Sequence, residues 1–152
     1  MSRIYWNDAF ATGINIIDQQ HQRIIHYINE LDAAGKSASP QQLREILLNL
    51  MDYTLSHFTF EEALMDEAGF PAAHLHSQTH DRFREKIYEY QQRLEKQEDI
   101  QLELSKMLNT WLIAHIADDD TSYVPYIKEN MPGLNENHHH NWVSQKINEI
   151  FH

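Results

Sequence analysis

The sequence predicts an all-α protein: an antiparallel up-down-up-down four-helix bundle with an irregular N-terminal arm and a short additional C-terminal helix. The chain holds only four Gly and four Pro among 152 residues, which favours long helices over many strands and turns. Apolar residues recur every three or four positions in four segments, which is the period of a helix with one buried face. Short connections with capping signals separate the segments, so consecutive helices should pack antiparallel.

The N-terminal arm and the first helix differ in their apolar pattern. Residues 1–13 have no clear period, and their aromatic side chains are expected to pack across the bundle: Tyr5, Trp6 and Phe10. From Ile14 the apolar positions become helical, and Asp18 is a plausible cap near the start. We predict that this first helix stops at Gly35.

Three further helices follow in the same way. Ser39-Pro40 is a capping residue followed by a proline that suits the first helical turn, and the second helix should run from there to Gly69. The third is predicted from about Pro71 or Ala72 to the mid-90s, with Leu75 facing inward. The fourth carries an apolar stripe over residues 104–116 and ends before an acidic run.

The last 20 residues are predicted to be a loop and a short amphipathic helix. Asn141 is the candidate cap of that helix, and Trp142, Val143 and Ile147 lie on its apolar face. We therefore predict one bundle domain over residues 1–132, with residues 133–152 as an appended tail rather than a second domain.

Composition excludes several classes of function. The net charge of −11 disfavours nucleic acid and anionic membranes as partners. The absence of cysteine excludes disulfides, thiolate metal sites and thiol nucleophiles. With no signal-peptide pattern and no long apolar run, we expect a soluble cytoplasmic protein.

Histidines and carboxylates on the apolar stripes predict a metal centre. His57 and Glu61 lie four residues apart, as do His76 and His80, so each pair leaves one helix face. His21 lies on the stripe of the first helix. Buried imidazoles and carboxylates need compensating charge, which a metal ion supplies.

The fourth predicted helix adds His115 and Asp120. Their i,i+5 spacing requires Asp120 to reach from a distorted or terminating turn. Seven candidate ligands exceed what one ion takes from protein, so we predict two ions, with Glu61 and Asp120 bridging them and one coordination position left open.

Each feature also has a plainer interpretation. A single histidine on an apolar face, such as His21, is more often a hydrogen-bonded core residue than a ligand, and only the combination of pairs favours metal. His26, His74 and His152 look ordinary, and His138, His139 and His140 fit a polar loop better than a surface metal site. Five apolar residues within about a turn of the ligands are either core residues or the lining of the open position: Ile24, Phe58, Trp111, Leu112 and Ile116.

The chain resembles the hemerythrin family, specifically the bacterial hemerythrins, from roughly Trp6 to Tyr123. The motifs are Gly13-Ile14, Asp18-Gln19-Gln20-His21, His57-Phe58-Thr59-Phe60-Glu61-Glu62, His76-Ser77-Gln78-Thr79-His80, and His115-Ile116 through Asp120 to Tyr123. The resemblance implies a non-haem di-iron centre. One iron is held by His76, His80 and His115 and the other by His21 and His57, with Glu61, Asp120 and an oxo or hydroxo group as bridges.

The resemblance further implies reversible O2 binding at the two-histidine iron, for storage, delivery or sensing, rather than enzymatic turnover. The pocket would be lined by Ile24, Phe58, Trp111, Leu112 and Ile116, and small anions such as azide would compete. Two alternatives stay open. One is a sensing module that acts on a protein partner or a fused output domain through the C-terminal tail. The other is a di-iron oxidase, peroxidase or nitric oxide-reducing enzyme, which the histidine-rich ligand set disfavours.

Overall fold

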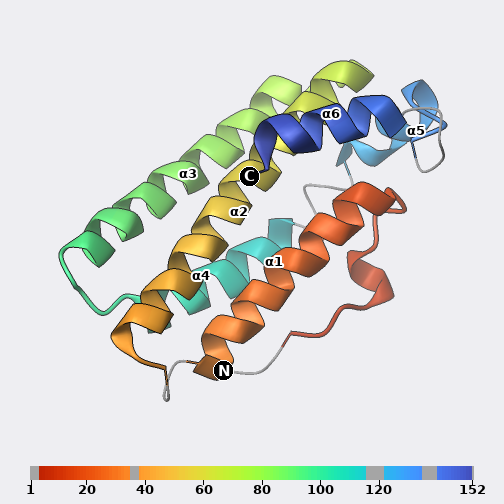
Figure 1. Cartoon of the computed structure of the whole chain (residues 1–152). Coiled ribbons are helices and arrows are strands. Elements are labelled where there is room, and N and C mark those ends of the chain that lie inside the picture. Colours follow the sequence, from red (N-terminus) through yellow and green to blue (C-terminus); the bar gives the residue numbers. More distant parts are fainter. Residues whose placement is uncertain (1–3, 35–37, 116–121, 135–139, 152) are drawn as a thin grey trace.

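The computed structural model describes residues 4–34, 38–115, 122–134 and 140–151, and within these ranges it is all-helical. The elements are η1 (Asp8–Phe10), α1 (Asn15–Ala34), α2 (Pro40–Ala68), α3 (Ala73–Glu95), α4 (Gln101–Ala114), α5 (Val124–Asn130) and α6 (His140–Ile150). The first four α-helices form an up-down-up-down bundle (Figure 1) in which α1 packs on α2 and α4, and α2 packs on α3. The predicted fold class is confirmed.

The ends of α2 are set by local chemistry. The hydroxyl of Ser39 accepts a hydrogen bond from the backbone N–H of Gln42, while the Gln42 side chain accepts one from the backbone of Ser39. This capping box satisfies two donors that the first turn leaves unpaired, and Pro40 suits the first helical position. At the other end Gly69 takes a left-handed conformation with φ of 68°, which glycine adopts without a Cβ clash.

Asp18 lies in the first turn of α1 and reaches back to the arm, instead of capping N–H groups of the helix itself. Its carboxylate accepts hydrogen bonds from the backbone N–H and the hydroxyl of Thr12, both at 2.8 Å, and from the N–H of Gly13 at 3.2 Å. The Thr12 hydroxyl accepts from Ile14 in turn. Asp18 therefore ties the arm to the helix that carries His21.

Four local expectations were wrong. The helix α6 begins at His140, so Asn141 lies inside this helix and is not its cap. Leu75, in the first turn of α3, is 66% exposed, and Tyr5 is 71% exposed while Ile4 is buried. The helix α5 was also not expected, although Pro125 occupies a first-turn position that favours a helix start. Trp6 and Phe10 do pack against the bundle core as predicted.

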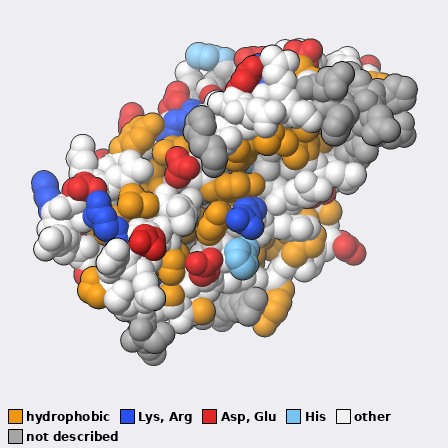
Figure 2. Space-filling model, in the orientation of Figure 1, with side chains coloured by type: hydrophobic (Ala, Val, Ile, Leu, Met, Phe, Trp, Pro, Cys, Tyr) orange, Lys and Arg blue, Asp and Glu red, His pale blue; other side chains and the backbone are white. Residues whose placement is uncertain are grey.

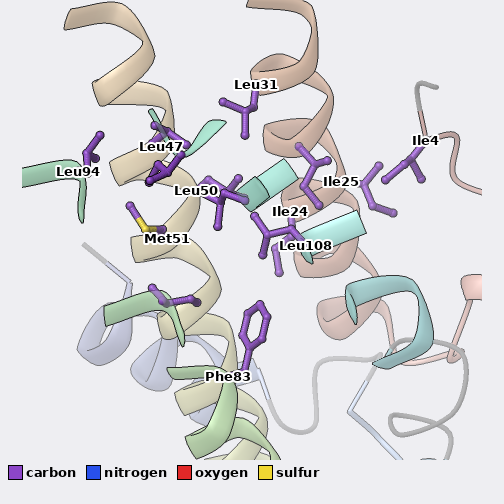
Figure 3. Close-up of a cluster of buried hydrophobic side chains, with 14 of the residues drawn as sticks. Ile4, Ile24, Ile25, Leu31, Leu47, Leu50, Met51, Phe83, Leu94 and Leu108 are labelled. Carbon is purple, nitrogen blue, oxygen red and sulfur yellow. The ribbon is translucent and has the colours of Figure 1, made fainter. Parts of the chain in front are cut away.

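One end of the bundle interior is apolar. Figure 3 shows aliphatic side chains of α1, α2 and α4 converging between the helices. Its fully buried members include Ile24, Leu31, Leu47, Leu50 and Met51. These side chains bring the helices together at the end of the bundle where α2 begins.

The outer face of α2 is covered by the C-terminal helix α6. Phe60 is buried there against Trp142 and Phe151, with ring centroids 6.0 and 6.3 Å apart. Phe151 also contacts Tyr53, 5.1 Å away. The amphipathic tail thus packs on the helix that carries His57 and Glu61.

The surface is mixed in charge. On the face shown in Figure 2, basic side chains are scattered among acidic, apolar and other polar ones. In the part of the chain that the structure describes, no helix combines the length and apolar character needed to cross a membrane.

Candidate metal centre

The other end of the bundle interior holds five histidines and one glutamate, all buried. They form two groups whose candidate ligand atoms lie within 4.8 Å of one another: Glu61 with His76, His80 and His115, and Glu61 with His21 and His57. The candidate ligands come from α1, α2 and α3 and, in the case of His115, from the residue directly after α4. The predicted convergence of these six residues is what the structure shows.

Glu61 belongs to both groups. Its Oε1 lies 2.5 Å from Nε2 of His57, 3.5 Å from Nε2 of His115 and 3.9 Å from Nε2 of His80. Its Oε2 accepts a hydrogen bond of 2.9 Å from the hydroxyl of Tyr123, which is also buried. Burial alone would raise the pKa of Glu61, but the imidazoles of His57 and His115 hold the pKa well below its usual range, so the carboxylate is ionised.

Two of the imidazoles are held from behind through Nδ1. Nδ1 of His57 lies 2.7 Å from Oε1 of Gln20, and since an amide oxygen only accepts, the imidazole donates. Nδ1 of His80 lies 3.2 Å from Oε2 of Glu62. Both contacts leave Nε2 directed at the group centre, as is typical of metal-binding histidines.

Glu62 is itself fixed by two donors. Its Oε1 accepts a hydrogen bond from Ser77 at 2.7 Å, and its carboxylate forms an ion pair with Arg84 at 2.5 Å. Half-burial raises the pKa of Glu62, but the hydrogen bonds from His80, Arg84 and Ser77 outweigh it and lower the pKa to about 2. Glu62 is therefore an anchored anion beside His80.

The donor set fits a non-haem metal ion. Nε2 of His80 is buried and has no hydrogen-bond partner in the described part of the chain, a costly state that coordination would relieve. Imidazole nitrogen with carboxylate oxygen suits iron and other divalent first-row ions, and the chain has no thiolate to offer. Two overlapping groups that share a carboxylate suit two such ions.

Aromatic rings cover one side of the centre. Phe58 stacks on His80 with centroids 4.2 Å apart, and Trp111 stacks on His115 at 4.6 Å. The two rings meet edge to face at 5.4 Å, and Phe83 stacks on the other face of Trp111. Phe58 is fully buried and Trp111 partly buried, so together they form an apolar wall beside the three-histidine group.

The other predicted site residues have different positions. Ile24 is fully buried one turn after His21. Leu112 lies in α4, but its side chain is outside what the structure describes, and Asp120 and Ile116 lie outside the described residues. The predicted second carboxylate therefore stays a prediction.

The remaining histidines lie away from the two groups where they are described. His26 is an exposed partner of Glu30, 3.6 Å away, and His74 contacts Gln78 at the exposed start of α3. His140 begins α6, whereas the predictions for His138, His139 and His152 lie outside the described residues.

Sequence reasoning assigned no role to Gln20, Glu62, Arg84 and Tyr123. Each contacts a ligand, or a residue that holds one, from a different helix or from the segment after α4. Spacing along one helix shows which residues share a face but not which residue of a neighbouring helix meets them. Gln20, Glu62 and Tyr123 stand in the motifs that carry the family resemblance, which is a signal that could have found them, whereas Arg84 stands outside those motifs.

Comparisons with known proteins agree with this centre. The model of the family described as hemerythrin HHE cation binding domain matches residues 12–127. The bacteriohemerythrins of Pseudomonas aeruginosa (strain LESB58) and Stenotrophomonas maltophilia (strain R551-3) are 37% and 38% identical, each over 99% of both chains. A crystal structure of wild-type hemerythrin superposes with a TM-score of 0.77 at 25% identity, covering 82% of this chain and 97% of that chain. The alignments with the two bacterial relatives thus run through the C-terminal tail.

Proposed function

The chain belongs to the hemerythrin family, and from that premise we propose that it binds O2 reversibly at a pair of non-haem iron ions, for oxygen storage, delivery or sensing. The observation that carries the proposal is that two buried ligand groups meet at one carboxylate, Glu61. The names of the bacterial relatives support an oxygen-binding role over an enzymatic one.

We assign the two groups to the two ions. His76, His80 and His115 would hold one iron, and His21 and His57 the other, with Glu61 shared. The resemblance adds Asp120 as a second bridge and an oxo or hydroxo group as a third. The group with fewer histidines would then keep the open coordination position.

The bound iron pair supplies the electrons and the open position that O2 binding requires. The protein's own residues supply orientation and exclusion of water. Gln20 and Glu62 orient His57 and His80, and Tyr123 donates a hydrogen bond to Glu61. The rings of Phe58 and Trp111 exclude water from the three-histidine side, which would slow the irreversible oxidation of the pair.

The test is repeated oxygenation of the iron-loaded protein. We expect a visible charge-transfer band to appear when O2 is added to the anaerobic Fe(II) protein and to vanish when O2 is removed, over several cycles. An oxygen electrode with excess reductant separates the alternatives, since a carrier returns its O2 while an oxidase or peroxidase consumes it. A band that never forms, or steady O2 consumption, would contradict the proposal.

A sensing role is the second candidate, favoured by the packing of α6 on α2. Phe60, the residue before Glu61, contacts both Trp142 and Phe151 of the tail. A change in the iron pair could therefore reach the tail and a protein partner bound to it. Deleting residues 134–152 should leave reversible O2 binding intact if the tail only signals, whereas loss of the oxygenated spectrum would make the tail structural.

A further inference from the structure

The two ligand groups are supported from behind by chemically different side chains. The imidazole of His57, in the two-histidine group, donates to a neutral amide, Gln20. The imidazole of His80, in the three-histidine group, donates to a carboxylate, Glu62. Gln and Glu have nearly the same shape, so the main difference between the two supports is charge.

On the amide side, the support itself carries no charge. Gln20 is buried and directly precedes His21, so it serves the two-histidine group alone. Its Oε1 takes the proton of His57, while its Nε2 makes no hydrogen bond to any described residue. An amide in this place fixes the ring orientation of His57 without making the imidazole a stronger donor to a cation.

On the carboxylate side, the negative charge is anchored. Glu62 accepts hydrogen bonds from Ser77 and Arg84 as well as from His80. Arg84 is held in turn by Asp81 at 2.9 Å. A carboxylate behind a metal-binding imidazole makes that imidazole more basic and a better ligand, and it adds favourable charge for a bound cation.

We propose that Gln20 and Glu62 are positioning residues that make the two metal positions unequal, so that the three-histidine group binds a divalent cation more tightly and fills first. The inference rests on the proposed two-ion centre and deepens it. The two-histidine group, which keeps the open coordination site, would then also lose its cation first. The extra histidine of the tighter group acts in the same direction, so the test must change the supports and leave the ligands alone.

The experiment is an anaerobic titration of the metal-free full chain with Co(II), whose visible bands report coordination, against a competing chelator. The wild type should show two steps, and His57→Ala should lose the weaker one, which identifies it. Glu62→Gln should weaken the tighter step by about 10-fold to 100-fold and leave the weaker step within about 3-fold. Gln20→Glu should strengthen the weaker step by about 10-fold and leave the tighter one unchanged.

Each variant has a matched control that makes the same change in charge at a neighbouring exposed position. Glu67→Gln lies on α2 with Glu62, and Gln19→Glu is adjacent to Gln20. Circular dichroism verifies that every variant is folded. If Glu62→Gln and Gln20→Glu behave like their controls, the supports only hold the rings and the inference is overturned while the two-ion centre stands. If the wild type binds fewer than two Co(II), the proposed centre fails and the inference fails with it.

Discussion

The two ends of the bundle interior are built from the same helices but from opposite chemistry. At one end α2 contributes Leu47, Leu50 and Met51, and further along the same helix it contributes His57 and Glu61. All five side chains are buried to a similar degree. Burial therefore does not distinguish the two ends, and only the polarity of what is buried does.

The apolar end stabilises the fold without help, whereas the polar end needs a cation. Each fully buried Leu or Ile stabilises the native state by roughly 1.5–3 kcal/mol. Buried imidazoles and carboxylates instead cost free energy unless they are paired. The apolar end thus holds the helices in place, while the polar end buries imidazoles and a carboxylate that suit a metal ion.

The largest effect that we expect is loss of iron from the polar end when Glu61 is replaced. Glu61→Ala removes the ligand common to both groups, and we expect the iron content to fall from two ions per chain to one or none. The apolar end should keep the fold helical. Metal analysis after anaerobic reconstitution measures the change, with Glu67→Ala on the exposed face of α2 as the control. Full retention of two irons would remove Glu61 from the ligand set.

The second effect is at the apolar end. Leu50→Ala leaves a cavity in a fully buried site and should lower the free energy of unfolding by about 2–5 kcal/mol. The loss should be the same in metal-free and iron-loaded protein, because Leu50 belongs to neither ligand group. Urea unfolding of both forms measures it, with Leu102→Ala at a 65% exposed position as the control. A loss that depends on iron would show that the two ends are not independent.

A smaller effect is expected at Tyr123. Tyr123→Phe removes the hydrogen bond to Oε2 of Glu61 and leaves a buried charge with one partner fewer, at a cost of about 1–3 kcal/mol in the metal-free protein. The cost should shrink once iron is bound, because the cation compensates the carboxylate. Thermal unfolding with and without metal measures both values, and Tyr126→Phe is the control. Equal costs in the two forms would mean that Tyr123 does not act through Glu61.

The smallest expected effect is at the aromatic wall. Trp111→Leu opens space beside His115 and admits water, so the oxygenated protein should oxidise irreversibly several-fold faster, equivalent to about 1 kcal/mol in the barrier. Loss of the oxygenated spectrum over time gives the rate. Tyr88→Leu, at an exposed position of α3, should leave the rate as it is. An unchanged rate in the Trp111 variant would show that this ring does not protect the iron pair from water.

The sequence predicted the elements whose signals are local. Ser39-Pro40 and Gly69 mark the ends of α2 because capping depends on residues within one turn. The convergence of the six described candidate ligands in one interior followed from helical spacing combined with the apolar stripes. The supports of the ligands did not follow, because Gln20 meets His57 and Tyr123 meets Glu61 only through the packing of different elements. The exposure of Leu75 likewise did not follow from its apolar side chain or its spacing along α3.

A crystal structure of the iron-loaded protein, with anomalous diffraction at the iron absorption edge, tests most directly whether two irons occupy the two groups that share Glu61. We expect two anomalous peaks inside the polar end of the bundle. One should lie among His76, His80 and His115 and the other between His21 and His57, with Glu61 in contact with both. A single peak, or peaks outside these two groups, would contradict this assignment.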